Sequence, residues 1–127
     1  MRRLMLVVAA LVAACGTDSG SAPRPGTLTL TLASGGTSDG AVVVLVSGGP
    51  ILSVDGPAEY QIASNTDASG THIMIVGNIS SGVVATLHVA DISRASGYVA
   101  TVEQVADRNS FALLDAARDQ VTVGAAK

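Results

Sequence analysis

Aromatic side chains are almost absent from this chain, which has no tryptophan, two tyrosines and one phenylalanine among its 127 residues. Hydrophobic residues nevertheless make up 48% of the sequence, so any core must be built from valine, isoleucine, leucine and alanine. Modules that bind carbohydrate usually stack sugar rings on tryptophan or tyrosine. An aromatic platform for a glycan is therefore not expected, and only recognition of a sugar by polar groups stays open.

Basic side chains are also few, and beyond Arg24 they form no cluster. The chain has seven lysines and arginines against ten acidic residues. Arg2 and Arg3 lie in an N-terminal segment that we expect to be removed, which leaves five basic against ten acidic side chains and a formal charge of −5. A charge of this sign disfavours binding to nucleic acid or to anionic lipid headgroups.

Cysteine occurs once, at Cys15, and the apolar run before it is too short to cross a bilayer. Two arginines at the start precede an unbroken apolar run over residues 4–12, and the small residues Ala13 and Ala14 come directly before Cys15. A spanning helix needs about 20 apolar residues, so this run is a targeting segment. The pattern predicts a secretory signal peptide over residues 1–14 that ends in a lipoprotein-type cleavage box (lipobox).

These residues resemble the start of bacterial lipoproteins. The resemblance implies that the Cys15 sulfur receives a diacylglyceryl group, that the chain is cut before Cys15, and that the new amino group is acylated. Because two or more acyl chains give stable anchoring, we expect Cys15 to hold the protein on a lipid bilayer. Gly16 stands where an aspartate commonly retains such proteins at the inner membrane of diderm bacteria, which favours the outer membrane or the cell surface. The alternative is an ordinary signal peptide that leaves Cys15 as a free thiol.

The chain from Cys15 onward divides into a linker, one domain and a short tail. Residues 15–26 include many small polar residues and two prolines, a composition typical of a flexible linker. From Thr27 the pattern is that of β-strands, and residues 27–32 alternate threonine with leucine as a half-buried strand does. We place the domain at residues 27–124 and the tail at residues 125–127.

Nine short strands are predicted, at a spacing of about ten residues that is typical of a β-sandwich or barrel. They cover residues 27–32, 41–46, 51–54, 60–63, 71–76, 83–90, 98–105, 111–114 and 120–123. Ser-Gly pairs lie between several of them, and glycine supplies the positive φ that hairpin turns need. The fold class is therefore all-β, an antiparallel β-sandwich. By propensity, residues 99–108 could instead form a helix, and residues 115–119 could form a short helical turn.

Two of these strands contain runs that are apolar on both faces, residues 41–46 and residues 73–76 of the strand 71–76. A strand with one face in water should alternate, so both faces of these strands are expected to be covered or partly dry. Exposed apolar surface of that size would mark an interaction site or an aggregation hazard. Either another part of the chain covers the outer face or a partner does. We favour cover from within the chain, since central strands also tolerate valine on the outside.

One serine motif is a candidate for hydrolytic chemistry. Residues 36–40 read Gly-Thr-Ser-Asp-Gly, which matches the G-x-S-x-G nucleophile elbow of α/β-hydrolases with Ser38 as the nucleophile. The elbow needs a helix after the serine, whereas residues 41–46 are predicted to be a strand. A hairpin loop explains the glycine-rich tract better.

His72 and His88 are the only histidines, and both fall inside predicted strands. Two histidines on adjacent strands could share a zinc ion, but a catalytic site normally needs a third protein ligand, for which Asp67 or Asp91 would have to serve. His88 shares a strand face with Thr86, as a solvent-facing position does. We favour polar surface roles for both histidines and predict no catalytic residue, metal site or cofactor.

Two loops are rich in aspartate and asparagine and are candidate calcium-binding loops, residues 65–67 and 107–109. Calcium takes six to eight oxygen ligands, so either loop would need backbone carbonyls and waters to complete the site. The same residue types are favoured in turns because their side chains bond the local backbone. We favour the turn interpretation for both loops.

Four segments within residues 26–123 carry a resemblance to a known family. They are GTLTLTL at the start, DGAVVVLVSGGPILSV next, GTHIMIVGNISSGVVATLHVA in the middle and QVTVG at the end. This pattern resembles a cohesin-type sandwich. Cohesins are nine-stranded jelly rolls that bind calcium-loaded dockerins through a sheet face. The resemblance implies the fold, and it assigns no dockerin-contacting residue to this chain.

The sequence therefore predicts a membrane-anchored envelope lipoprotein whose β-sandwich acts as a non-catalytic binding or structural module. A protein partner would meet a sheet face or a set of loops. Two alternatives stay open. One is an exported hydrolase that uses Ser38 or a histidine-based metal site, and the other is a passive envelope lipoprotein without a dedicated ligand.

Overall fold

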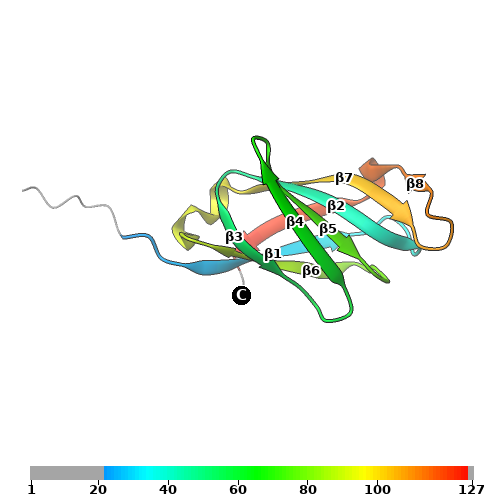
Figure 1. The fold of residues 1–127 in the computed structure, drawn as a ribbon, viewed down its shortest axis with the longest axis horizontal. Helices are drawn as coiled ribbons and strands as arrows, with labels where there is room; N and C mark the ends of the chain where they lie inside the picture. The colour runs from blue at the N-terminus through cyan, green and yellow to red at the C-terminus, as the bar shows by residue number, and fades with distance from the viewer. Residues whose placement is uncertain (1–21, 126–127) are drawn as a thin grey trace, which may run out of the picture.

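The computed structural model describes residues 22–125, so the predicted signal peptide, Cys15 and part of the predicted linker lie outside the described residues. Within this range the chain forms nine β-strands and two short 3-10 helices (Figure 1). The strands are β1 Gly26–Ala33, β2 Asp39–Ser47, β3 Ile51–Asp55, β4 Gln61–Asp67, β5 Gly70–Val76, β6 Gly82–Val89, β7 Val99–Asp107, β8 Leu113–Leu114 and β9 Gln120–Ala125. The 3-10 helices are η1 Ile92–Gly97 and η2 Ala116–Arg118. Neither helix is long and apolar enough to span a membrane.

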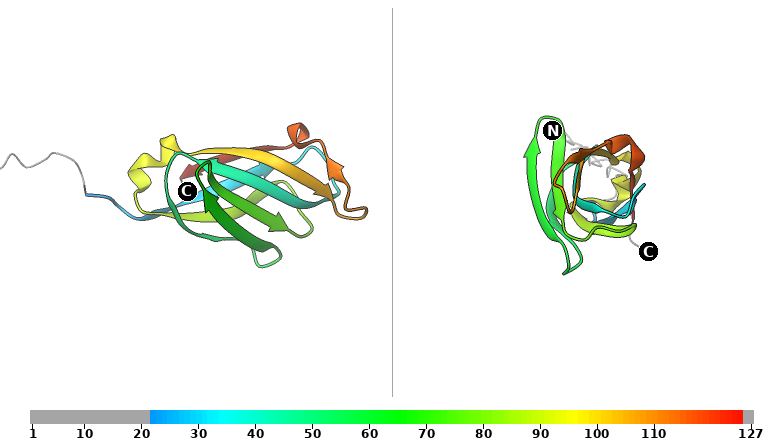
Figure 2. Two further views of the ribbon diagram at one scale, coloured as in Figure 1. Left: turned by 45° about the horizontal axis from the view of Figure 1, so that its top comes forward. Right: turned by 90° about the vertical axis from the view of Figure 1, so that its right-hand side faces the viewer.

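The strands form two antiparallel sheets packed face to face, which confirms the predicted all-β sandwich (Figure 2). One sheet has the order β3-β6-β1-β9, and the other has the order β4-β5-β2-β7-β8. All nine predicted strands are present, and residues 99–107 form strand β7 rather than the alternative helix. The predicted helical turn corresponds to η2, whereas η1 was not predicted.

The core forms because the strands place alternate aliphatic side chains between the two sheets. Leu28, Leu30 and Leu32 of β1 are buried in one cluster with Val44 and Ile73 of the five-stranded sheet. Burying a leucine, valine or isoleucine side chain contributes about 2 kcal/mol. The alternation read from the sequence therefore supplies the main stabilisation of the sandwich.

The two ends of the sandwich carry different features. The chain enters beside η1, where the Ile92 N–H donates to the Arg24 carbonyl at 2.7 Å and the Arg24 N–H donates to the Asp91 carboxylate at 3.4 Å. We call this the proximal end. The β1–β2, β5–β6 and β7–β8 loops lie together at the opposite end, which we call the distal end (Figure 1).

The outer faces of the two sheets differ in polarity. The four-stranded sheet presents mainly threonines, namely Thr27, Thr29, Thr31, Thr86 and Thr122. Its exposed large apolar side chains are Leu52 and Val83. The five-stranded sheet instead presents Val43 and Leu45 of β2 and Met74 and Val76 of β5, which we call the outer strip.

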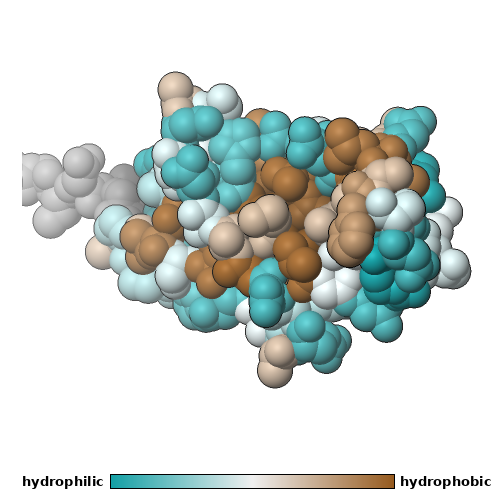
Figure 3. Space-filling view, turned by 45° about the vertical axis from the view of Figure 1, so that its right-hand side comes forward, coloured by the Kyte–Doolittle hydropathy of each residue, from teal (hydrophilic) through white to brown (hydrophobic). Residues whose placement is uncertain are grey.

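Cover of the outer strip from within the chain was expected, and this expectation is wrong for the two β5 residues. Met74 is 45% exposed and Val76 is 36% exposed. The end-on view shows no element of residues 22–125 lying outside β4 and β5 (Figure 2). Val43 and Leu45 are half-buried because β2 lies between β5 and β7. In the space-filling view, apolar surface gathers in the middle of the face that includes the distal end (Figure 3).

Candidate binding surface

The distal loops are tied to one another by backbone hydrogen bonds. The Arg108 N–H donates to the Ser38 carbonyl at 2.6 Å, and the Gly77 N–H donates to the Gly40 carbonyl at 3.0 Å. A Cβ atom on Gly40 would lie 2.5 Å from the Arg108 Cα atom, so the close approach of the β7–β8 loop to β2 requires glycine. The loops therefore hold the distal surface in a fixed shape.

Asp107 closes the β7–β8 turn with its backbone and its side chain. One carboxylate oxygen accepts hydrogen bonds from the N–H groups of Asn109 and Ser110 and from the Ser110 hydroxyl, at 3.1, 3.0 and 3.0 Å. Hydrogen bonds from Ser38 and Ser110 lower the pKa of the Asp107 carboxyl to about 2. This carboxylate is ionised and engaged by its own turn, which supports the turn interpretation of residues 107–109.

Phe111 has a strained backbone in the same loop. Its φ is 58°, the left-handed region, and it is the only non-glycine residue with positive φ between residues 22 and 125. This conformation costs a non-glycine residue about 1–2 kcal/mol. Burial of the ring does not compensate, because Phe111 is 83% exposed. Strained residues of this kind gather at ligand-binding and switch regions.

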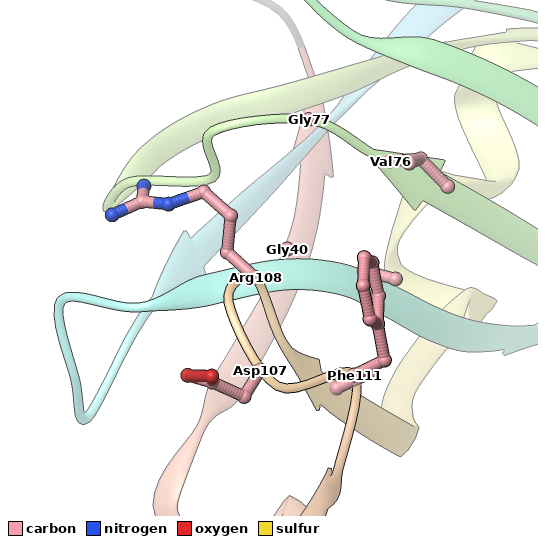
Figure 4. A pocket seen from close by; sticks show the side chains of 8 residues that line it. Gly40, Val76, Gly77, Asp107, Arg108 and Phe111 are labelled. Carbon is pink, nitrogen blue, oxygen red and sulfur yellow. The ribbon is translucent and has the colours of Figure 1, made fainter.

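Beside Phe111 lies a mostly apolar hollow of about 260 Å³. It is lined by Gly40, Ala41, Val76, Gly77, Ala106, Asp107, Arg108 and Phe111. The Phe111 ring stands at one side of the hollow and leans toward Val76, whereas the Arg108 guanidinium points the other way (Figure 4). Val76 belongs to both the hollow and the outer strip, so the two form one continuous apolar surface.

The proximal part of this face carries a charged histidine. Asp67 Oδ2 lies 2.8 Å from His72 Nε2, and Glu103 Oε1 lies 2.6 Å from His72 Nδ1. Hydrogen bonds to Glu103 and Asp67 raise the pKa of His72. Both ring nitrogens face carboxylates, so both must donate, which is possible only for the protonated imidazolium. The three side chains together carry a net negative charge.

A buried ionic cluster lies behind the β1–β2 loop. Asp39 is fully buried, and its carboxylate accepts hydrogen bonds from the Ser34 hydroxyl and the Arg118 guanidinium. Asp119 is 4% exposed and accepts a 2.9 Å hydrogen bond from the Gly35 N–H. Its other carboxylate oxygen, Oδ2, is buried and has no hydrogen-bond partner within residues 22–125.

The pKa values of the two carboxyl groups in this cluster are shifted in opposite directions. Burial raises the pKa of Asp119, and its contact with the Asp39 carboxylate raises that pKa further. Burial also acts to raise the pKa of Asp39, but hydrogen bonds from Ser34 and Asp119 and the charge of Arg118 outweigh it and lower that pKa. Asp119 therefore binds a proton more readily than Asp39 does, and the hydrogen bonds of the cluster join the β1–β2 loop to the segment before β9.

The structure separates the side chains that were candidates for catalysis. Ser38 lies at the distal end, where its carbonyl accepts a hydrogen bond from the Arg108 N–H. His72 lies on the outer face of the five-stranded sheet, and His88 lies on the outer face of the four-stranded sheet with its Nε2 2.6 Å from Asp55 Oδ2. The outer faces point away from each other, so the two histidines cannot share one ion.

The remaining candidate ligands are engaged elsewhere. Asp91 caps η1, where it accepts hydrogen bonds from the Ser93 N–H at 3.1 Å and the Ser93 hydroxyl at 2.6 Å. Asp67 accepts a 2.8 Å hydrogen bond from the Ser69 N–H in addition to its contact with His72. Among residues 22–125 no group of three or more histidine, cysteine, aspartate or glutamate side chains is placed to hold a metal ion.

The hollow beside Phe111 was missed by reasoning from the sequence. Residues 111–114 were predicted as a strand, but strand β8 begins only at Leu113, and Phe111 lies in the loop before it. The available signal was Asp107-Arg108-Asn109-Ser110, a typical turn sequence directly before a lone aromatic residue. Cys15 lies outside the described residues, and its lipidation stays a prediction.

No protein-family model, no curated protein and no solved structure matches this chain.

Proposed function

We propose that this protein is a lipid-anchored protein of the bacterial cell envelope whose β-sandwich acts as a non-catalytic binding or structural module. The observation that carries the proposal is that the two ends of the sandwich differ. The chain enters at the proximal end, whereas the hollow, the exposed Phe111 and the outer strip form an apolar surface that reaches the distal end. Apolar surface of this extent, uncovered within residues 22–125, is typical of an interaction site.

The mechanism would be presentation of this surface away from a membrane. Acyl chains on Cys15 would fix the N-terminus, preferably at the outer membrane or the cell surface. Residues 16–26 would give a reach of at most about 40 Å, since an extended residue spans about 3.5 Å. The sandwich would then hold its apolar surface toward a protein partner at the end opposite to its tether.

A hydrolase is the less well supported function. Both histidines within residues 22–125 lie on the outer faces of the sheets, away from Ser38. A strand follows Ser38 where the elbow requires a helix. The hollow has few polar groups, and the Asp107 carboxylate in its lining is held by its own turn. The arrangement fits capture of an apolar group better than activation of a nucleophile.

Mass spectrometry of the native protein tests the anchor. We expect an N-terminal peptide that begins at Cys15 and carries three acyl chains, and we expect a Cys15→Ser variant to stay uncleaved. Ala13→Ser, which keeps a small residue before the cysteine, serves as the matched control and should still be processed. A native product with an unmodified Cys15 thiol would overturn the lipid-anchor part of the proposal.

A second experiment tests the binding part. Envelope preparations containing the full-length chain would be treated with a membrane-permeant cross-linker, and the linked products would be compared between Val76→Lys and Thr86→Lys. The former places a charge on the proposed surface, and the latter places one on the outer face of the other sheet. Loss of a product only in Val76→Lys supports a binding role, whereas products that both variants retain would contradict it.

A further inference from the structure

Strand β4 is the one long edge of the sandwich that carries no protective feature among residues 22–125. It runs over Gln61–Asp67 at the margin of the five-stranded sheet, and its register with β5 continues without a bulge. It contains no proline and no lysine, and every side chain except that of Ile62 is exposed. Natural proteins usually shorten, charge, bulge or cover such an edge, because its unpaired backbone groups can pair with another chain.

The other three edges of the two sheets differ from β4. Strand β8 has only two residues, and the register of β3 with β6 shifts between Ile51 and Ser53, as at a β-bulge. Strand β9 packs beside η1 and beside β7 of the other sheet. The end-on view shows β4 on the outside of the molecule, with no element of residues 22–125 beyond it (Figure 2). An edge open to pairing is therefore a particular feature of β4.

The turn between β4 and β5 determines which backbone groups of β4 face outward. Asp67 is opposite Gly70 across a two-residue turn, and the register then runs on without a shift. In an antiparallel pair, hydrogen-bonded and non-hydrogen-bonded residues alternate, so the pair that closes the turn fixes the rest. The N–H and C=O groups of Ile62, Ser64 and Thr66 therefore point away from β5. No backbone hydrogen bond from another element of residues 22–125 reaches them.

A hollow of about 220 Å³ lies beside this edge. Gln61, Ile62 and Ala63 of β4 line it together with Met74 and Val76 of β5. Side chains of a strand added to β4 would alternate between the two faces of the sheet, and those beside Ala63 would reach this hollow. Strand addition gives affinity through main-chain hydrogen bonds and specificity through pockets for alternate side chains. The edge and the hollow together provide both.

We propose that an extended segment of a partner protein adds to β4 as a sixth strand of this sheet and places an apolar side chain in the hollow. The inference rests on the proposed function, in that it takes the sandwich as a binding module, and it adds the kind of partner and the way it binds. The occupant is a polypeptide strand, because a peptide backbone offers donors and acceptors at the spacing that β4 presents. An apolar side chain suits the lining, since a polar one would lose hydrogen bonds to water there.

A second copy of the chain is less well suited to this edge. Antiparallel pairing of β4 with itself over its full length is centred on Ser64. It would place Asn65 of the other copy beside Ala63, and Asp67 of the other copy beside Gln61. An amide and a carboxylate would then lie next to the apolar hollow. The partner is therefore a different chain, whose strand carries an aliphatic or aromatic residue at this position.

Hydrogen exchange of the full-length chain in its envelope tests the proposal directly. In β4 without a partner, the N–H groups of Ile62, Ser64 and Thr66 are open to water and exchange rapidly, whereas those of Ala63 and Asn65 bond to β5 and exchange slowly. An added strand should slow the first set about tenfold relative to the same protein purified in detergent, away from other envelope proteins. The second set is the internal control and should change little.

Proline substitution separates pairing of the backbone from a contact of side chains. Ser64→Pro removes an outward N–H and leaves the hydrogen bonds between β4 and β5 in place, whereas Ser64→Ala keeps that N–H. With a photo-cross-linking residue in place of Ala63, Ser64→Ala should retain the linked product and Ser64→Pro should lower its yield about tenfold. Circular dichroism checks that the proline variant is folded, and the exchange measurement in the wild-type chain does not depend on that variant.

Each result decides the matter. Slow exchange of the outward N–H groups in envelopes and loss of product only in Ser64→Pro support strand addition. Equal exchange in envelopes and in detergent, or equal yields from the two Ser64 variants, overturn it. A linked product of twice the chain's mass would show a second copy and overturn the choice of partner. Product that is lost in Val76→Lys but retained in Ser64→Pro would overturn strand addition and leave the proposed binding function standing, so the two failures are distinguishable.

Discussion

The guanidinium of Arg118, at the end of η2, hydrogen-bonds the fully buried carboxylate of Asp39 at the start of β2, 79 residues earlier in the chain. This pair joins the β1–β2 loop to the segment before β9. Removing the cation would leave a buried carboxylate without its main counter-charge. Such a loss is strongly destabilising, whereas exposed ion pairs contribute little.

Arg118→Ala is therefore expected to lower the free energy of unfolding by about 3 kcal/mol. Urea denaturation followed by circular dichroism measures the change. Arg94→Ala is the matched control, because the Arg94 side chain is 83% exposed and its ion pair with Asp91 should be worth less than about 1 kcal/mol. Equal effects of the two substitutions would contradict the structural role of the buried pair.

Asp119 should make the folding stability depend on pH with a sign opposite to that of most carboxylates. Because its pKa is raised on folding, its contribution to stability is present below the ordinary value of 3.8 and is lost as pH rises through the raised value. Asp119→Asn keeps a neutral side chain at every pH. The stability of the variant relative to wild type should therefore improve as the pH rises from below 3.8 through the raised pKa of Asp119. A stability difference that does not change with pH would contradict the raised pKa.

His72 should remain protonated to higher pH than an ordinary histidine. Its hydrogen bond to Glu103 is the largest cause, so Glu103→Gln should lower the pKa of His72 toward its ordinary value of 6.5. The contribution of protonated His72 to the stability is fully present below pH 6.5 and is lost as the pH rises through the raised pKa. NMR titration of the imidazole measures the shift, and Glu59→Gln, which removes an exposed carboxylate elsewhere, should leave it unchanged.

Phe111 allows a direct test of backbone strain. At a position with φ of 58°, glycine is unstrained and alanine is strained, so Phe111→Gly should be more stable than Phe111→Ala by about 1 kcal/mol. In a strand the order would be reversed, since glycine there is less stable than alanine. Urea denaturation of the two variants decides between them.

The strands could be predicted from the sequence because their signal is local. The alternation of residues 27–32 and the buried run at 41–46 each identify a strand without knowledge of its partner. The exposure of Met74 could not be predicted in the same way. It depends on whether any other element of the chain lies over β5, which is a property of the topology.

The candidate surface was harder to predict for the same reason. The Asp39–Arg118 pair and the contact of Arg108 with Ser38 join residues that are far apart in the chain. The backbone strain at Phe111 arises from a turn that Asp107 closes. The predicted strand over residues 111–114 gave no reason to expect a turn there. Cys15, by contrast, is identified by a short local pattern, the apolar run and small residues before it.

Oxidation of Met74 tests the central claim, that a partner covers the outer strip, most directly. Met1 and Met5 fall in the predicted signal peptide, so Met74 is the only methionine expected in the processed chain. Its conversion to the sulfoxide by peroxide can be followed by mass spectrometry in intact envelopes and in the same protein unfolded in urea. A covered strip predicts that Met74 in envelopes is oxidised much more slowly than in urea. Oxidation at the same rate in both would show that Met74 remains open to water and would contradict the account.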